Sequence, residues 1–395
     1  MVEGNGSDLK AVVLAAGEGR RLKPLTNVRP KPMIPVANRP LLEDVVKALS
    51  EAGVDDIVLV VGYKKDRIQT YFGDGDDWDV DITYVVQNKQ LGTGHAVMQA
   101  EKYVEGDFLV LNGDRIVEAD SVEQLIQRYL EVEGCVMSVS RSDEPSDYGV
   151  VDMEAGKAVD VREKPPEYDT RSDIINAGLY AFNQSVFDYI GRGDVGGEIS
   201  LTDALRRMMS DIDVNVVRSE GLWIDVSYLW DILTVNSQVI DRTGGSVKGN
   251  ARIRDGAQVS GRSLVGNDCH VGTNATILPG TSLGENVSVG ANAVVSNSVV
   301  LPDATIGEGS VVKDTIISGN THVGPNVTME GGKSRVIVDD ELYQDVRLGG
   351  VVGDNTQIGA ASVVESGNII GNDVSIGVGS LVRRNVDPKT RVEHG

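Results

Sequence analysis

The residues from Val12 to Leu22 have the composition of a phosphate-binding segment. They read Val-Val-Leu-Ala-Ala-Gly-Glu-Gly-Arg-Arg-Leu, so an apolar run passes directly into a glycine-rich turn and two arginines. Small residues at such a turn allow backbone N–H groups to approach phosphate oxygens. An Arg-Pro-Lys-Pro string at 29–32 adds further cations. A Gly-x-Gly tripeptide alone is usually an ordinary turn, so it is the whole string that indicates a site for a polyanionic ligand.

Further motifs of polar and small residues follow along the N-terminal half. In order they are Gln87 with Gln90–Ala96, Asn112–Asp114, Tyr148–Val150, Glu163–Pro165, Asn176–Gly178 and Trp223–Asp225. With the glycine-rich string they resemble the sugar-1-phosphate nucleotidyltransferase family, which opens with Leu-Ala-[Ala/Gly]-Gly-x-Gly-x-Arg and a nearby Lys-Pro. The resemblance covers roughly 210 residues, and so many motifs in one order leave little room for coincidence.

The resemblance implies a role for particular residues of each motif. The catalytic residues would be Arg21 and Lys31, and the metal ligands Asp114 and Asp225. Nucleotide contacts would come from Leu14, Ala15, Ala16, Gly17, Gln87, Gly92 and Thr93. Contacts to the sugar phosphate would come from Gly149, Glu163, Lys164 and Asn176.

The implied reaction joins a nucleoside triphosphate to a sugar 1-phosphate and releases pyrophosphate. Because the attacking phosphate oxygen is already anionic, no general base is needed, and catalysis reduces to alignment and charge neutralisation. Arg21 and Lys31 would stabilise the transition state and the departing pyrophosphate. Asp114 and Asp225 would share one Mg²⁺, a hard cation suited to oxygen ligands.

The base and the sugar remain open at this point. The segment that starts at Gln87 is closest to uridylyltransferases for N-acetylglucosamine 1-phosphate, whereas the Glu-Lys-Pro string fits thymidylyl- and uridylyltransferases for glucose 1-phosphate equally well. The expected function is therefore transfer from UTP or dTTP to a glucose-type sugar 1-phosphate. A non-catalytic subunit that senses sugar nucleotides is the alternative from another class. Its weakness is that a sensor has no need for Arg21, Lys31, Asp114 and Asp225 together.

Three residues within the motifs call for a separate interpretation. His95 is expected to pack or to form hydrogen bonds rather than to catalyse, and Trp223 is expected to be a core aromatic residue. Arg115 follows the metal-binding aspartate at a position where relatives usually carry a small polar or acidic residue. It is therefore a departure from the family pattern.

The pattern of residues 10–243 predicts an α/β domain. Short apolar runs are expected to be buried strands, namely 11–15, 57–61, 82–86, 108–111 and 136–140. Residues 41–52 and 121–132 are expected to be helices between them. Strand, glycine turn and helix follow one another as in a mainly parallel, Rossmann-like sheet, whose strand ends form a ligand crevice.

After Gly244 the period changes to six residues. Apolar residues recur at every sixth position from Val247 to Val295 and again from Val352 to Val382, and small residues often follow four positions later. This repeat resembles the left-handed parallel β-helix of hexapeptide proteins, whose coils bury apolar rungs by stacking. We expect a β-helix over 244–395, a register slip near Ile306, and an insertion at 330–350.

In bifunctional relatives such a β-helix acetylates an amino sugar with acetyl-CoA, using a histidine in an Asn-His-Leu segment. The corresponding place here holds Lys-Asp-Thr at 313–315, and His322 is expected to be structural. Acetyl-CoA is therefore a less favoured ligand, and a scaffold or oligomerisation role is favoured for this half.

The charge balance limits the partners. The 395 residues include 59 acidic and 37 basic ones, a formal charge of −22, which argues against nucleic-acid and anionic-membrane surfaces. With few aromatic residues, this excess also favours a salt-adapted protein. Cys135 and Cys269 are expected to be packing residues, with no disulfide or cysteine metal cluster. We expect a flexible tail at 1–9, no targeting or membrane segment, a cytoplasmic location, and a homo-oligomer such as a trimer.

Overall fold

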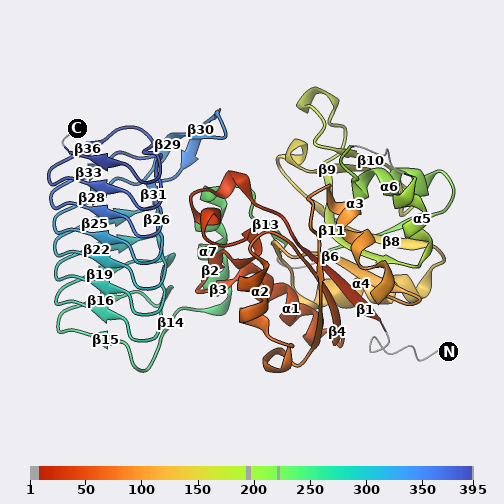
Figure 1. Cartoon of the computed structure of the whole chain (residues 1–395), viewed down its shortest axis with the longest axis horizontal. Helices are drawn as coiled ribbons and strands as arrows, with labels where there is room; N and C mark the ends of the chain where they lie inside the picture. The colour runs from red at the N-terminus through yellow and green to blue at the C-terminus, as the bar shows by residue number, and fades with distance from the viewer. Residues whose placement is uncertain (1–8, 193–196, 220–222, 394–395) are drawn as a thin grey trace. The chain divides into compact units, whose positions relative to one another are not determined.

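The computed structural model describes residues 9–192, 197–219 and 223–393 (Figure 1). The tail expected at 1–9 therefore lies outside the described residues, apart from Leu9. No described helix is both long enough and apolar enough to cross a membrane.

The chain forms two compact units, and they do not follow a single cut in the sequence. The first unit contains the chain up to Glu18, Pro30–Met33 and Leu41–Asp225. The second contains Gly19–Arg29, Ile34–Pro40 and the chain from Val226 onwards. Two short N-terminal segments thus belong with the C-terminal half.

The first unit is built on a nine-stranded sheet, as far as its residues are described. The strand order is β5-β4-β1-β6-β11-β8-β12-β10-β9. The strands are β1 (Lys10–Ala15), β4 (Asp56–Val61), β5 (Asp81–Val86), β6 (Phe108–Asn112), β8 (Cys135–Arg141), β9 (Gly149–Glu154), β10 (Lys157–Glu163), β11 (Ile174–Phe182) and β12 (Val214–Arg218). The helices are α1 (Leu41–Glu51), α2 (Lys65–Phe72), α3 (Thr93–Gln99), α4 (Ala119–Glu131), α5 (Ser185–Gly191) and α6 (Leu201–Met209). The short strands β7 (Arg115–Ile116) and β13 (Ile224–Asp225) pair separately.

Both faces of this sheet are covered. In β1, Val12 packs into one apolar cluster while Ala11 and Val13 pack into the other, and all three side chains are fully buried. A strand buried on both faces must be apolar throughout, which is why the runs were recognisable in the sequence. The five predicted strands and the two predicted helices are confirmed, with ends shifted by one or two residues.

The sheet is less parallel than the alternation of strands and helices predicts. The strands β5, β4, β1 and β6 are parallel, as is the pair β8–β12. Strand β11 is antiparallel to both β6 and β8, and β9 and β10 form a hairpin turned at Ala155 and Gly156, which have φ angles of 48° and 81°. This mixed half carries the predicted sugar-phosphate residues.

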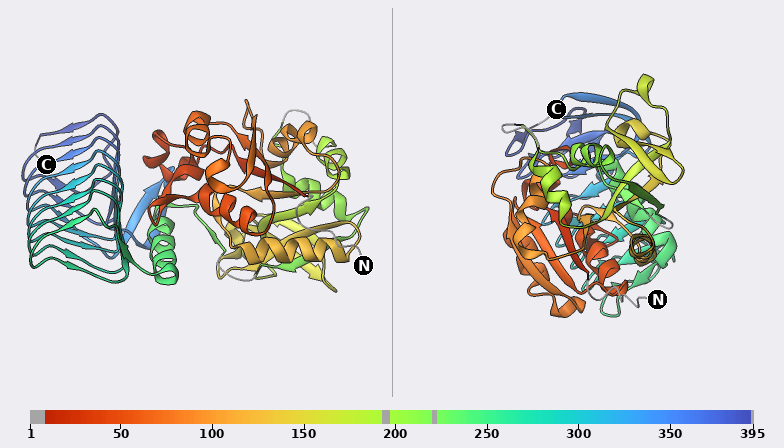
Figure 2. Two further views of the ribbon diagram at one scale, coloured as in Figure 1. Left: turned by 90° about the horizontal axis from the view of Figure 1, so that it is seen from below. Right: turned by 90° about the vertical axis from the view of Figure 1, so that its right-hand side faces the viewer.

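The second unit contains a left-handed parallel β-helix whose coils stack in three sheets (Figure 2). The first sheet holds β14 (Ser246–Val247), β17 (Ser263–Val265), β20 (Thr281–Leu283), β23 (Val299–Val300), β26 (Thr315–Ile317), β31 (Gly350–Val352) and β34 (Asn368–Ile370). The second holds β15 (Arg252–Ile253), β18 (His270–Val271), β21 (Ser288–Val289), β24 (Thr305–Ile306), β27 (His322–Val323), β32 (Gln357–Ile358), β35 (Ser375–Ile376) and β37 (Arg391–Val392). The third holds β16 (Gln258–Val259), β19 (Thr276–Ile277), β22 (Val294–Ser296), β25 (Val311–Lys313), β28 (Thr328–Met329), β33 (Val363–Val364) and β36 (Leu381–Val382).

The register of the repeat slips at a different place from the one predicted. The interior residues Val295 and Val300 are five positions apart, and so are Val312 and Ile317. Ile306 lies in the core in phase with Val300, so the prediction of a slip near Ile306 was wrong in position. Each slip is a corner shortened by one residue, which leaves the apolar rungs stacked.

Further elements of the second unit precede the coils or project from them. Helix α7 (Leu229–Thr243) leads into the β-helix, and the small strands β2 (Pro35–Val36) and β3 (Arg39–Pro40) form a hairpin. The strands β29 (Lys333–Val338) and β30 (Glu341–Arg347) form a second hairpin within the region 330–350 (Figure 1).

Candidate active site

The glycine-rich segment and the first metal motif meet at the carboxyl ends of β1 and β6. These strands are parallel neighbours, and the N–H of Gly113 donates to the carbonyl of Leu14 over 2.9 Å. The predicted residues Leu14–Gly17 and Asp114 therefore lie at one edge of the sheet. This edge is where open α/β sheets bind ligands.

Neither a steric contact in the described chain nor its backbone conformation requires glycine at position 17. A Cβ at this position would meet no heavy atom of the described chain within 4 Å, and the φ angle of Gly17 is not positive. A side chain there would instead occupy open space beside the turn. A ligand that needs close approach to the backbone is a physical reason for the glycine.

The predicted base-recognition residue Gln87 is buried and oriented by two contacts. Its Nε2 donates to the carbonyl oxygen of Gly92 over 3.2 Å and lies 2.9 Å from Nδ1 of His95. Because a carbonyl oxygen only accepts, these contacts fix which end of the amide is nitrogen. The Oε1 of Gln87 remains as the acceptor, and His95 has the hydrogen-bonding role expected for it.

Gly92 and Thr93 tie this segment to the chain before α6. Gly92 has a φ angle of 95°, and a Cβ there would lie 2.6 Å from the carbonyl oxygen of Ile199, so only glycine fits. The hydroxyl of Thr93 accepts from the N–H of Leu201 over 3.1 Å. Gln90 links the segment to the glycine-rich turn, because its Nε2 donates to the carbonyl of Ala16 over 2.7 Å.

Lys31, Asp114 and Asp225 form one charged cluster. The Nζ of Lys31 is 2.7 Å from Oδ2 of Asp114 and 3.8 Å from Oδ1 of Asp225, although the two aspartates are far apart in sequence. Burial alone would lower the pKa of Lys31, but the two carboxylates outweigh it and hold the pKa above its ordinary value. The ammonium group is therefore charged throughout the physiological range.

Arg115 belongs to this cluster, although the sequence suggested only a departure from the family. Its Nη1 donates to the carbonyls of Ala177 and Asn176 over 2.8 and 3.2 Å, and its Nε lies 3.9 Å from Asp225. Its guanidinium is 4.8 Å from the ring centre of Trp223, whose Nε1 donates to Ala177 over 2.7 Å. The signal available in the sequence was a cation directly after Asp114, the predicted metal ligand.

The donor set fits a hard divalent cation held jointly with a substrate. Asp114 and Asp225 point to one ammonium group, so a cation can also lie between them, and both offer only oxygen. In the described part of the chain, no group of three or more histidine, cysteine, aspartate or glutamate side chains gathers around such a position. The remaining ligands of a metal here would be phosphate oxygens and water.

The predicted sugar-phosphate residues lie together on β9, β10 and β11. Gly149 is directly opposite Glu163 in the β9–β10 pair, and a Cβ on Gly149 would lie 3.5 Å from the Cβ of Asn176. The carboxylate of Glu163 accepts from the hydroxyl of Thr202 over 3.1 Å, a partner that the sequence motifs missed. Asn176 is buried and hydrogen-bonds the hydroxyl of Tyr180.

Lys164 is held in a strained conformation at the end of β10. Its φ angle is 43°, in the left-handed region that favours glycine, and its N–H donates to the carbonyl of Tyr148 over 2.9 Å. The ring of Tyr148 contacts Trp223 edge-on, which connects Lys164 to the cluster around Asp225. Strain of this kind at a non-glycine residue is typical of functional positions.

Arg21 belongs to the second unit. It lies in the 3₁₀ turn η2 (Arg20–Leu22), and its guanidinium is 5.3 Å from the ring centre of Tyr228. The glycine-rich string is thus divided between the units after Glu18.

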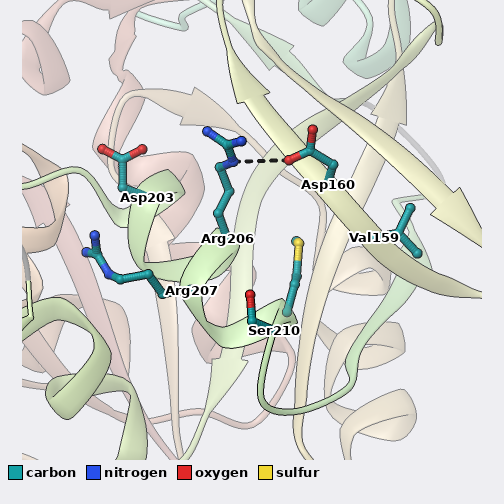
Figure 3. A pocket seen from close by; sticks show the side chains of 7 residues that line it. Val159, Asp160, Asp203, Arg206, Arg207 and Ser210 are labelled. Carbon is teal, nitrogen blue, oxygen red and sulfur yellow. Dashed lines mark hydrogen bonds and ion pairs between the residues drawn. The ribbon is translucent and has the colours of Figure 1, made fainter.

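A surface hollow elsewhere on the first unit contains none of the predicted site residues (Figure 3). It lies beside β10 and α6, and it is lined by Val159, Asp160, Asp203, Arg206, Arg207, Met209 and Ser210. Arg206 donates to Asp160 over 3.0 Å, as Figure 3 shows, and Arg207 donates to the carbonyl of Tyr189. Both arginines already have partners, and the hollow stays outside the candidate site.

The fold defines the class of protein: an α/β, Rossmann-like domain followed by a left-handed β-helix. The chain belongs to the nucleotidyl transferase family, whose match covers residues 10–242. Residues 259–347 match a second family, described as the GMPPB C-terminal domain.

Named relatives and solved structures agree with this membership. The chain is 39% identical over 268 residues to a bifunctional protein GlmU of Methanococcus maripaludis, covering 65% of this chain and 62% of the relative. It is 36% identical to the low-salt glycan biosynthesis nucleotidyltransferase Agl11 of Haloferax volcanii, covering 64% of this chain and 72% of the relative. A structure of UDP-glucose pyrophosphorylase from Acinetobacter baumanii superposes with a TM-score of 0.53 at 27% identity, covering 58% of this chain and 92% of that chain. The match thus spans less than two thirds of the length of the GlmU relative.

In the β-helix, the place expected for an acetyl-transfer histidine holds Asp314, which is only 4% exposed. Its Oδ1 accepts from Asn297 over 2.6 Å and from Arg347 over 3.0 Å, and its Oδ2 accepts from the N–H of Gly332. Asp314 therefore has a structural role at the base of the hairpin β29–β30.

Proposed function

We propose that this protein transfers a nucleotidyl group from UTP or dTTP to a glucose-type sugar 1-phosphate and releases pyrophosphate. The observation that carries the proposal is the cluster of Lys31, Asp114 and Asp225 at the strand edge that also holds the glycine-rich turn. Relatives named as nucleotidyltransferases and a pyrophosphorylase structure support it.

The reaction requires one bond to form and one to break. A phosphate oxygen of the sugar 1-phosphate attacks the α-phosphorus, and the bond from that phosphorus to the bridging oxygen breaks, so that pyrophosphate leaves with its electron pair. Arg21 and Lys31 neutralise charge that builds up on the triphosphate. Mg²⁺, held by Asp114 and Asp225, would add Lewis-acid neutralisation when bound, as is general in this family.

Gln87 favours a base with an N–H at its pairing edge. With Nε2 committed to Gly92 and His95, its Oε1 is the group left to accept a hydrogen bond. Uracil and thymine carry an N3–H donor, whereas N3 of cytosine is an acceptor. This agrees with UTP or dTTP and disfavours CTP.

The sugar phosphate is assigned to the mixed half of the sheet. Lys164 supplies the positive charge for the phosphate, and Glu163 and Asn176 supply acceptors and a donor for sugar hydroxyls. Gly149 leaves room for the ring, because a Cβ there would lie 3.2 Å from the carboxylate of Glu163.

We assign the β-helix to scaffolding and to assembly of a homo-oligomer, which light scattering would test, and we place the protein in the cytoplasm, where its substrates occur. Acetyl transfer is not proposed, since Asp314 takes the position of the expected histidine.

A substrate matrix tests the proposal. Five nucleoside triphosphates are each combined with several sugar 1-phosphates and Mg²⁺, and pyrophosphate release is measured. We expect UTP or dTTP with a glucose-type sugar 1-phosphate to dominate. Release with no combination would contradict the proposal and favour the sensor alternative.

A further inference from the structure

The hairpin β29–β30 is an ordered insertion with one packed and one open face. Val336 lies opposite Tyr343 in the register, and Val336 is fully buried. Ile337 and Leu342 lie opposite each other on the other face and are 53% and 55% exposed. The carboxylate of Asp314 holds the base of the hairpin through Arg347 and Gly332.

The packed face of the hairpin reaches the start of α7. The ring of Tyr343 lies 5.0 Å from that of Tyr228 and 5.2 Å from that of Trp230, and Tyr228 and Trp230 stack at 4.6 Å. The hydroxyl of Tyr343 donates to the carboxylate of Glu341 over 2.6 Å and lies 3.2 Å from the hydroxyl of Tyr228. The rings of Trp230 and Tyr343 thus fix the position of the Tyr228 ring, and the carboxylate of Glu341 holds Tyr343 in place.

The ring of Tyr228 in turn contacts the guanidinium of Arg21. The guanidinium lies over the Tyr228 ring at 5.3 Å, a distance at which the ring quadrupole attracts a cation. Hairpin, α7 and the turn around Arg21 all belong to the second unit, so this chain of contacts stays within one compact body.

The same segment is also held at its far end. The guanidinium of Arg29 donates to Asp354, a carboxylate just after β31 that is only 7% exposed. Between these points, the hydroxyl of Thr26 donates to the carbonyl of Gly19 over 2.9 Å and closes the segment on itself. Both ends of residues 21–29 thus contact groups from the C-terminal half.

We propose that the hairpin β29–β30 is a positioning element for nucleotidyl transfer, in which Tyr343 fixes Tyr228 and Tyr228 fixes the guanidinium of Arg21. The inference rests on the proposed function, because it gives Arg21 its role on the triphosphate. Tyr343 and Tyr228 are positioning residues and touch no substrate. The β-helix then contributes to the reaction through the geometry of Arg21.

The kinetic test removes the ring at the hairpin and then asks whether the effect passes through Arg21. Tyr343→Ala is expected to lower kcat about tenfold with little change in KM for the nucleotide, since a cation–π contact and an aromatic pair are lost. Tyr343→Phe keeps the ring and is expected to stay within about twofold of the wild type. In an Arg21→Ala background, Tyr343→Ala should cause no further loss.

A second measurement reports on the structure of the turn around Arg21 and does not depend on catalysis. Hydrogen exchange is followed at the amides of Leu22 and Lys23, which donate to the carbonyls of Gly19 and Arg20. Tyr343→Ala should speed exchange at these amides. Leu342→Ala, on the open face of the same hairpin, is the matched control and should leave both exchange and kcat unchanged.

The outcomes separate this inference from the proposed function. Unchanged exchange and kcat in Tyr343→Ala would overturn it, as would an equal loss of kcat with and without Arg21. A wild type that releases no pyrophosphate with any substrate pair contradicts the proposed function. In that case the exchange experiment alone still shows whether the hairpin holds the Arg21 turn.

Discussion

Lys31 contacts both aspartates of the candidate site, and its replacement should affect Mg²⁺ binding and catalysis differently. Lys31→Ala should lower kcat by about 10²- to 10³-fold, because the transition state loses a preorganised cation. Affinity for Mg²⁺ should be kept or increased, because Asp114 and Asp225 no longer share a competing ammonium group. Steady-state kinetics and calorimetric titration of Mg²⁺ measure the two effects.

Lys157→Ala is the matched control for this variant. Lys157 pairs with Asp213 on the surface of the same unit, so its loss should change neither quantity. Full turnover in Lys31→Ala would contradict the role given to Lys31.

The thiol of Cys135 provides a test of burial with a defined pH dependence. Burial raises the pKa of Cys135 to about 12, and its side chain is 1% exposed. Because its pKa is raised, the thiol stays neutral in the folded protein. This burial therefore lowers the free energy of unfolding only when the pH rises above the thiol pKa of the unfolded chain, which is about 8.5. Ellman's reagent at pH 8 should therefore find no reactive thiol in the native protein and both cysteines in denaturant. Rapid native labelling would refute this packing.

Residue types and spacing predicted which side chains belong to the site better than they predicted the contacts. Lys31, Asp114 and Asp225 could be grouped through the resemblance, and the structure brings them together. Arg115 could not be assigned, because its bonds to the carbonyls of Asn176 and Ala177 in β11 join residues that are far apart in sequence.

Among the helices, α7 is anchored to its surroundings by the side chain of Asn236. Its side chain is fully buried, accepts from the N–H of Ala37 and the hydroxyl of Ser282, and donates to the carbonyl of Gly280. Asn236→Leu leaves all three groups without that partner, and it should cost about 2–4 kcal/mol of unfolding free energy. Denaturant unfolding measures the cost.

Asn250→Leu is the comparison for this prediction. Asn250 is exposed and its side chain donates to Asp268, so its replacement should shift the unfolding free energy by less than about 0.5 kcal/mol. Equal shifts in the two variants would argue against the anchoring role of Asn236.

Elements with a uniform pattern were predictable, and those that depend on pairing were not. Buried strands such as β1 and β4 can be recognised in the sequence because they are continuous apolar runs. The strands of the hairpin β9–β10 are partly exposed and so lack such a run, whereas β11 is buried but is interrupted by Asn176 and Gly178. The antiparallel direction of β11 follows from its distant partners β6 and β8. One slip was predicted near Ile306, whereas the short corners follow Val295 and Val312, because a corner that is one residue shorter still leaves the apolar rungs stacked.

At the scale of the whole molecule, the formal charge of −22 predicts a dependence on salt. The Debye length falls from about 10 Å to about 3 Å between 0.1 and 1 M salt, which removes most of the self-repulsion between exposed carboxylates. The melting temperature should rise by about 5 °C or more over this range of KCl. A flat or falling melting temperature would argue for an ordinary acidic protein.

The two compact units do not follow the change of period in the sequence. A single boundary near residue 243 was the expectation from the change of period. Residues 19–29 and 34–40 nevertheless group with α7 and the coils, through contacts such as Asn38 to the carbonyl of Leu283. Contacts between residues so far apart in sequence leave no periodic trace.

Measuring both products of one reaction tests whether this protein transfers a nucleotidyl group with the help of a divalent metal. The wild-type protein is incubated with Mg²⁺, UTP or dTTP and a glucose-type sugar 1-phosphate, in parallel with Asp225→Asn and with a chelator. We expect equal amounts of nucleotide sugar and pyrophosphate from the wild type, and neither product from the variant or the chelated sample. Product formation that is unaffected by Asp225→Asn and by the chelator would contradict this expectation, as would the absence of any nucleotide sugar from the wild type.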